Sequence, residues 1–143
     1  MKNSVFIVMF SLLSLAGFSQ NNIEKQKFHF GRDQDTTAGY AQAVKVDNVL
    51  YISGTVGGGP DAAAALKMVY TNLERTLKHY GATFQNVVKE NLYTTDIEAV
   101  KQNNHVRKQF YKGDFPAATW VQIPRLYMPQ ATIEVELIAH LPK

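Results

Sequence analysis

The sequence predicts a single α/β domain in which a mixed sheet of about six strands carries two helices packed on one face. Strand-like and amphipathic stretches follow one another in the order hairpin, helix, strand, helix and two final strands. Two helices can cover only one face of a sheet of this size. The chain has 143 residues, enough for one compact domain with a modest core.

The first 20 residues have the pattern of a secretory signal peptide. Lys2 precedes a short apolar run at 5–15, and small residues follow before a polar stretch begins at Asn21. This run is too short to anchor the chain in a bilayer, although a buried N-terminal helix is an alternative interpretation. We therefore expect a signal peptide at 1–20 and a single domain at 21–143. The protein would be periplasmic or secreted, with no membrane segment after cleavage.

The composition argues against several classes of function. The chain has no cysteine, so neither disulfides nor a thiolate metal site can stabilise it. Lysine and arginine are scattered and nearly balanced by acids, which gives no basic surface for nucleic acid and argues against a ribonuclease. The four histidines show no metal-ligand spacing, and we interpret them as surface or packing residues. These are His29, His79, His105 and His140.

The first predicted elements are an edge strand and a hairpin. Residues 21–37 are polar except for the alternating patch at 28–30, which fits an edge strand. Residues 43–46 and 49–53 are strand-like, and Asp47-Asn48 between them favours a hairpin turn. The second of these runs is apolar on both faces, which is typical of a central strand. The glycines at 55–60 indicate a connecting loop, because no phosphate-binding lysine and hydroxyl residue follow them.

Two helices and a strand come next. The first helix begins at Pro60-Asp61 and ends at Gly81, and it carries an apolar stripe at i, i+3 and i+4 spacing. A strand at 87–93 leads through a capping segment to a second helix at about 97–112. The stripe of the first helix consists of Leu66, Val69, Leu73, Leu77 and Tyr80.

Asn104 and Arg107 lie together on a half-apolar face of the second helix. Either this face lies at the solvent boundary, which the pattern alone favours, or the two side chains point into a site.

The last two strands, at 118–123 and 132–140, are limited by prolines on both sides. Period-2 alternation puts only apolar residues on one face of the final strand, whereas Glu134 and Glu136 lie with Ile138 on the other. Two carboxylates in this position indicate either a solvated face or a polar cleft. Because two helices leave this face uncovered, a second copy of the chain is the simplest cover, and we expect a homo-oligomer with polar clefts at its subunit boundaries.

Several stretches, in this order, resemble the Rid/YjgF family of reactive-intermediate deaminases. The resemblance spans nearly the whole domain, and it implies an α/β fold like that of chorismate mutase. It also implies a homotrimer with a small-molecule ligand at its subunit interfaces. Active members hydrolyse enamines and imines to 2-oxo acids and ammonia without a metal or an organic cofactor. The matching stretches are GYAQAV at 39–44, LYISG at 50–54, YGA at 80–82, VVKENLYTTDI at 87–97, Asn104, FPA at 115–117 and IEVELIA at 133–139.

The resemblance also implies roles for individual residues. Glu134 would orient and deprotonate the attacking water, and Tyr40 and Asn104 would hold the nitrogen side of the substrate. The substrate-binding positions that it implies, by side chain or backbone, are Gly54, Ala118, Thr119 and Trp120, with Arg107 as a further candidate.

One position departs from the family pattern. Active members have an arginine that grips the substrate carboxylate with a two-pronged hydrogen bond, and this chain has Ala118 there. Each such bond contributes about 1.5–3 kcal/mol, so the loss predicts kcat/KM lower by on the order of a hundredfold for carboxylate-bearing imines. Arg107 is a candidate to replace it, but a solvated surface arginine is the favoured interpretation. Two functions remain open: a weak or altered imine hydrolase centred on Glu134, and a non-catalytic binder of a small ligand.

Overall fold

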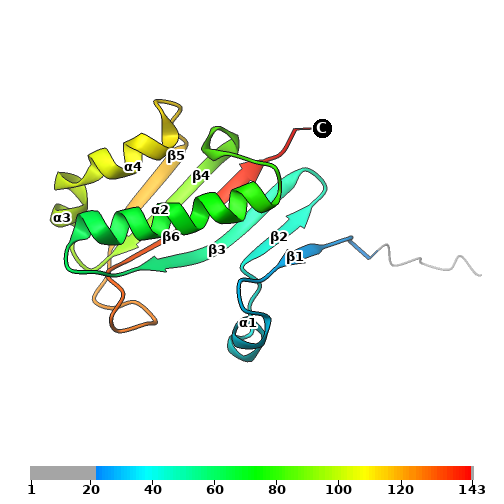
Figure 1. The fold of residues 1–143 in the computed structure, drawn as a ribbon, viewed down its shortest axis with the longest axis horizontal. Helices are drawn as coiled ribbons and strands as arrows, with labels where there is room; N and C mark the ends of the chain where they lie inside the picture. Colours follow the sequence, from blue (N-terminus) through cyan, green and yellow to red (C-terminus); the bar gives the residue numbers. More distant parts are fainter. Residues whose placement is uncertain (1–21, 143) are drawn as a thin grey trace, which may run out of the picture.

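The computed structural model describes residues 22–142, which form a six-stranded mixed sheet with helices against one face (Figure 1). The expected signal peptide at 1–20 lies outside the described residues. No helix in the described part of the chain combines the length and the apolar character needed to cross a membrane.

The strands follow the order β1-β2-β3-β6-β4-β5 across the sheet. All neighbouring pairs are antiparallel except β4 and β5, which are parallel because a helical crossover joins them. The strands are β1 (Gln26–Phe28), β2 (Ala43–Val46), β3 (Val49–Gly57), β4 (Val87–Thr94), β5 (Ala117–Gln122) and β6 (Ile133–His140).

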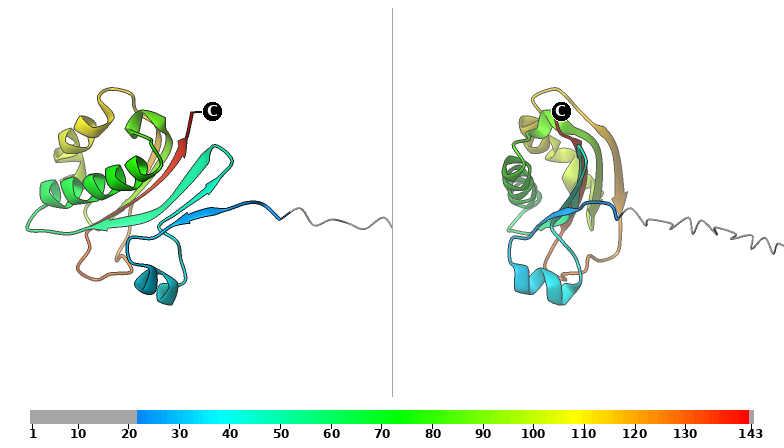
Figure 2. Two further views of the ribbon diagram at one scale, coloured as in Figure 1. Left: turned by 45° about the vertical axis from the view of Figure 1, so that its right-hand side comes forward. Right: turned by 90° about the vertical axis from the view of Figure 1, so that its right-hand side faces the viewer.

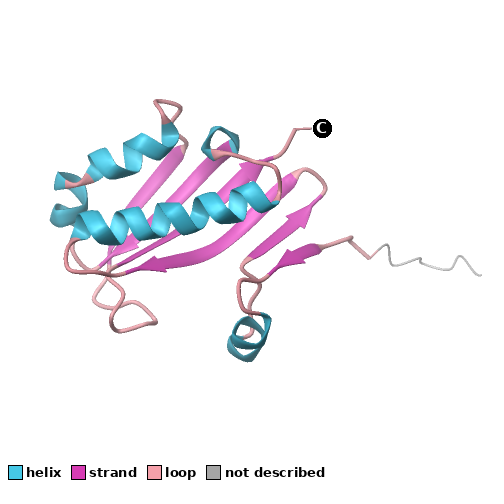
Figure 3. Cartoon of the chain, in the orientation of Figure 1, coloured by secondary structure: helices cyan, strands magenta, loops and turns pink. Residues whose placement is uncertain are grey.

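Three helices cover the same face of the sheet, as Figures 2 and 3 show. The long helix α2 lies across the strands, and α3 and α4 follow it toward the β5 edge, whereas α1 stands apart beside the ends of β1 and β2. The helices are α1 (Arg32–Ala38), α2 (Ala62–His79), α3 (Ile97–Gln102) and α4 (Asn104–Tyr111), with a short 3-10 helix, η1 (Phe84–Asn86).

The core lies between α2 and the sheet. Helix α2 begins where Asp61 accepts a hydrogen bond from the backbone N–H of Ala64 at 2.8 Å, and its predicted apolar stripe is buried apart from the half-buried Tyr80. The facing side chains of β6 are at most 2% exposed, as the alternation predicts. Gly57 permits the close approach of β3, since a Cβ there would lie 2.5 Å from the carbonyl oxygen of Ala65. The β6 side chains in this core are Ile133, Val135, Leu137 and Ala139.

The opposite face of the sheet carries no helix among the described residues (Figure 2). Tyr51 on β3 is 48% exposed there, and Glu134, Glu136 and Ile138 on β6 are only half-buried. We call this surface the open face. It is the face for which the sequence predicts a subunit contact.

Four elements differ from the sequence prediction. The edge strand lies at β1 rather than at 28–30, and strand β3 continues through Gly57 into the segment predicted as loop. The predicted helix at 97–112 is broken at Asn103, whose side chain donates to the carbonyl oxygen of Ala99. Helix α1 was not predicted. It has no apolar period, and its Thr36 hydroxyl donates back to the carbonyl oxygen of Arg32.

Candidate functional site

A hollow of about 370 Å³ opens beside Glu134 at one end of the open face. Strands β3 and β6 form its floor, and the segments before β2 and before β6 form its walls. We call it the Glu134 hollow. Its lining residues are Ala38, Tyr40, Ser53, Gly54, Val56, Tyr127, Met128 and Glu134.

The carboxyl group of Glu134 rests directly on the backbone of Gly54. A Cβ built on Gly54 would overlap Oε1 of Glu134, and it would lie 2.8 Å from the carboxyl carbon. The pairing of β3 with β6 is irregular between Ile52 and Thr55, so the backbone bulges beside this contact. Glycine at 54 therefore determines where the carboxylate can lie.

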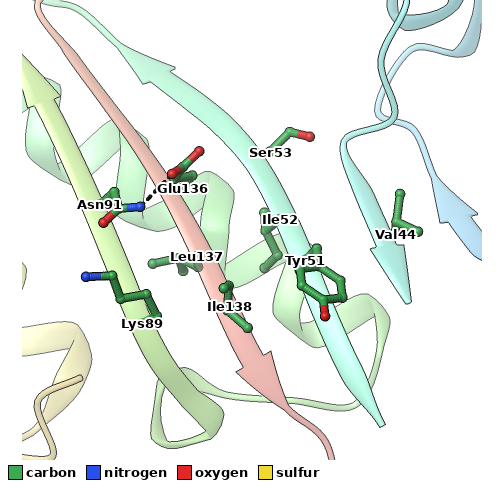
Figure 4. Close-up of a pocket in the computed structure, with 9 residues that line it drawn as sticks. All are labelled: Val44, Tyr51, Ile52, Ser53, Lys89, Asn91, Glu136, Leu137 and Ile138. Atoms are coloured by element: carbon green, nitrogen blue, oxygen red, sulfur yellow. Dashed lines mark hydrogen bonds between the residues drawn. The ribbon is translucent and has the colours of Figure 1, made fainter. Parts of the chain in front are cut away.

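Burial and a neighbouring acid act together on Glu134. Burial raises the pKa of its carboxyl group, and the charge of Glu136 raises that pKa further. Glu136 itself accepts a hydrogen bond from Nδ2 of Asn91 at 2.6 Å (Figure 4). It accepts a second from the hydroxyl of Tyr93 at 3.3 Å. Glu136 is thus held by its neighbours, whereas Glu134 faces the hollow as a base with a raised proton affinity.

A second group of predicted site residues lies at the β5 edge, on the helix-covered side of the sheet. Ala118 pairs with Glu90 and Trp120 pairs with Leu92, both of which point into the core. Asn104 begins α4, and its Oδ1 atom is buried without a hydrogen-bond partner among the described residues. A buried acceptor without a donor is costly, so this atom is a candidate contact for a ligand N–H or a water.

Arg107 is buried, which corrects the expectation of a solvated surface arginine. Its Nε atom donates to Oε1 of Glu90 at 2.8 Å and to Oε2 at 3.1 Å, and its side chain is 6% exposed. Burial is the largest influence and lowers the pKa of the guanidinium, but the charge and hydrogen bond of Glu90, together with Tyr70 and Tyr111, raise the pKa overall. The two neutralise each other inside the protein.

Three further donors converge on Glu90, whose side chain is completely buried. They are the hydroxyl of Tyr111 at 2.7 Å, the hydroxyl of Tyr70 at 2.9 Å and Nε1 of Trp120 at 3.1 Å. Burial and then the Glu90 charge raise the pKa values of both tyrosines, so they stay protonated as donors. We call Glu90, Arg107, Tyr70, Tyr111 and Trp120 the Glu90 cluster. A carboxylate with this many donors is stable without solvent.

Within one chain, the predicted site residues thus fall into two groups. Glu134, Tyr40 and Gly54 share the Glu134 hollow on the open face. Asn104, Ala118 and Trp120 lie at the β5 edge, and strand β4 separates them from β6. Thr119 points to the open face, where its hydroxyl accepts a hydrogen bond from Nζ of Lys89 at 2.9 Å.

Sequence reasoning missed three residues at these places. Glu90 lies at an inward position of β4, and a charged residue in such a position signals a buried partner. Tyr127 and Met128 line the Glu134 hollow from the loop before β6, where no periodic pattern points to a side-chain direction. Among residues 22–142, no group of three or more histidines, aspartates or glutamates could hold a metal ion.

Comparison with known sequences gives a consistent picture. A family model described as endoribonuclease L-PSP matches residues 31–141. The chain is 36% identical over 109 residues to a human protein named 2-iminobutanoate/2-iminopropanoate deaminase, covering 70% of this chain and 78% of the human one. It is also 29% identical over 109 residues to a RutC family protein of Aquifex aeolicus, covering 70% of this chain and 86% of that one.

The fold has solved counterparts as well. A member of the YjgF/YER057c/UK114 family from Mycobacterium tuberculosis superposes with a TM-score of 0.76 at 27% sequence identity, covering 82% of this chain and all of the other. Yeast Mmf1 superposes with a TM-score of 0.68 over 73% of this chain and 89% of its own, and its 24% identity bears on the fold alone.

Proposed function

The chain belongs to the endoribonuclease L-PSP family, which is the YjgF/Rid family of its structural relatives, and from that membership we propose that it hydrolyses the C=N bond of imines, including the imine tautomers of enamines. The single observation that carries the proposal is the half-buried Glu134, which lies over Gly54 in the Glu134 hollow with its pKa raised. A relative named as an imine deaminase supports the reaction type.

The reaction requires one general base. Glu134 takes a proton from water as the water oxygen bonds to the imine carbon, and it returns this proton to the nitrogen. In the adduct, Glu134 then moves the hydroxyl proton to the nitrogen as the C–N bond breaks and the C=O bond forms, so one carbonyl compound and one ammonia leave for each water consumed. A raised pKa suits this exchange, because it makes the carboxylate a stronger base toward the water proton than an ordinary glutamate.

The site would be completed by a second chain in a homotrimer. The open face carries the Glu134 hollow, and the β5 edge carries Asn104 with its unpartnered Oδ1. A neighbour's β5 edge placed against the Glu134 hollow would bring that acceptor to the nitrogen side of the substrate. Tyr40 would contact the substrate from the chain that supplies Glu134.

Activity toward 2-imino acids would be weak. Ala118 stands where the family's carboxylate-binding arginine is expected, and the nearby Arg107 is paired with Glu90. The same observation favours a second candidate function, a non-catalytic binder of a small ligand in which Ala118 widens the pocket.

Glu134→Gln tests the proposal against this alternative. Imines are generated in place by an oxidase with catalase present, and carbonyl formation is followed against a buffer blank. We expect the variant to lose at least about a hundredfold in kcat/KM, since it has no base. Glu98→Gln, which removes an exposed carboxylate in a surface ion pair, serves as the control and should match the wild type. If the wild-type protein forms carbonyl product no faster than the buffer blank, the hydrolase proposal fails and the non-catalytic binder remains.

We also propose that the protein is exported after removal of residues 1–20. Mass spectrometry of the protein recovered from a bacterial periplasm should give an N-terminus close to Asn21. Recovery of the full chain from the cytoplasm alone would contradict export.

A further inference from the structure

The Glu134 hollow combines one acid with apolar walls. Among its described lining residues, Glu134 is the one charged side chain, and Val56, Tyr127 and Met128 supply apolar surface. A ligand carboxylate placed here would face Glu134 with no positive group from this set to offset the repulsion. A positively charged iminium nitrogen would be attracted instead.

At the β5 edge, which would form the other side of the site, the nearby arginine already has a buried counter-ion. Ala118 is exposed and apolar. Arg107 is held by Glu90, and its guanidinium carbon lies 4.6 Å from the ring centre of Tyr111 and 5.3 Å from that of Trp120. Moving Arg107 to a ligand would leave Glu90 charged, completely buried and without its counter-ion, which is strongly unfavourable.

Two other cations lie near the site, and the hydrogen bonds that they donate go to neutral groups of this chain. Lys89 points to the open face, donates to Thr119 and lines a separate hollow with Tyr51 and Glu136 (Figure 4). Arg125 precedes the wall residue Tyr127 by two positions, and its Nε donates to the carbonyl oxygen of Leu126 at 3.3 Å.

We propose that the substrates of this site are imines and enamines without a carboxylate, of the kind formed when primary amines are oxidised, and that 2-imino acids are discriminated against. The inference rests on the proposed function and specifies its substrate class. Two acceptors are offered to a ligand, the carboxylate of Glu134 and Oδ1 of Asn104, and both suit the N–H groups of an iminium ion. Each turnover adds one water to the C=N bond and releases one carbonyl compound and one ammonium ion, with no change in oxidation state.

The test compares two imines that differ only in the carboxylate. An amine oxidase acting on 2-phenylethylamine generates one, and an amino-acid oxidase acting on phenylalanine generates the other, each with catalase. The full chain is added and imine decay is followed by trapping with semicarbazide. We expect kcat/KM at least about tenfold higher for the amine-derived imine.

The outcomes separate this inference from the proposed function. Equal rates, or faster hydrolysis of the imine from phenylalanine, would overturn the substrate class and leave imine hydrolysis standing. No hydrolysis of either imine above the blank would overturn both.

Ala118→Arg provides a second measurement on the same pair of imines. The new guanidinium should raise kcat/KM for the phenylalanine-derived imine by about tenfold or more relative to the amine-derived one. Ala117→Arg is the matched control: it puts the same charge one residue earlier, on the open face of the strand, and should leave the ratio unchanged. An unchanged ratio in Ala118→Arg would contradict the assignment of this position to the carboxylate side of the substrate.

Discussion

Glu134 must be ionised to act as a base, and the structure keeps it protonated to a higher pH than an ordinary glutamate. We therefore expect the acid limb of the pH profile of kcat/KM to lie at a higher pH than the usual pKa range of glutamate would give. In Glu136→Gln this limb should move to lower pH, because the second cause of the raised pKa is removed while burial remains. A pH–rate profile of both proteins measures the shift. An acid limb that does not move would show that Glu136 does not act on the titrating group.

The same raised pKa affects stability with a definite sign. The folded chain binds the Glu134 proton more tightly than the unfolded chain does. Stability from this group is therefore present in full at low pH and is lost as the pH rises through the folded-state pKa.

Gly54→Ala should displace the carboxylate, since the new methyl group would overlap Oε1 of Glu134. We expect a loss of about tenfold or more in kcat/KM with the circular dichroism spectrum preserved. Ser53→Ala provides a neighbouring control that also lines the Glu134 hollow but has no such overlap, and it should lose less. Wild-type kcat/KM in Gly54→Ala would show that the position of this carboxylate is not critical.

For individual residues, the sequence predicted the direction of a side chain better than its partners. Alternation put Glu134 and Glu136 on one face of β6, and both lie there. The helical period put Arg107 on a half-apolar face but gave no sign of Glu90, which is 17 residues earlier in the chain. Contacts between β4 and α4 depend on tertiary packing, which no local pattern encodes.

The Glu90 cluster joins three elements, α2, α4 and β4, to the edge strand β5. Glu90→Gln would leave Arg107 buried without its counter-ion, and we expect the free energy of unfolding to fall by about 3–5 kcal/mol. Denaturant titration measures the change.

The surface pair of Lys101 and Glu98 provides the comparison. Its side chains are 57% and 66% exposed, so Glu98→Gln should lower the free energy of unfolding by about 0.5 kcal/mol or less. Similar costs for the two substitutions would show that the Glu90 cluster contributes no more than a surface ion pair.

Elements with strong periodicity were predicted closely, and those without it were not. Helix α2 combines an apolar stripe with the capping residue Asp61 and with Gly81, whose φ of 69° suits the turn after the helix. The break at Asn103 leaves the period of the surrounding sequence nearly intact, so the pattern predicted one helix.

For the whole molecule, the open face is the surface expected to contact other copies. Tyr51→Lys should reduce the mass measured by light scattering from that of a trimer toward that of a monomer, because a charge would be buried in the contact. Met68→Lys is matched to it: Met68 on α2 is 49% exposed against 48% for Tyr51, but it lies on the helix side. A trimer that persists in Tyr51→Lys, or equal effects of both variants, would put the contact elsewhere.

The order of the elements and the single helix-covered face could be predicted from the sequence. The number of strands followed from the number of strand-like stretches in the sequence. The open face followed because two helices are too few to cover both faces of the sheet. The sequence did not predict the parallel pairing of β4 with β5 or the place of β6 between β3 and β4. Strand order depends on pairing between segments that are distant in the sequence.

The separation of Glu134 from Asn104 across the sheet has a kinetic consequence. If each working unit takes its base from one chain and its amide from another, a lone chain is chemically incomplete. Turnover per chain should then fall when the protein is diluted below the dissociation constant of the assembly. Mixing two inactive proteins, Glu134→Gln and Asn104→Ala, should restore part of the rate. Protein concentration would itself regulate the proposed activity.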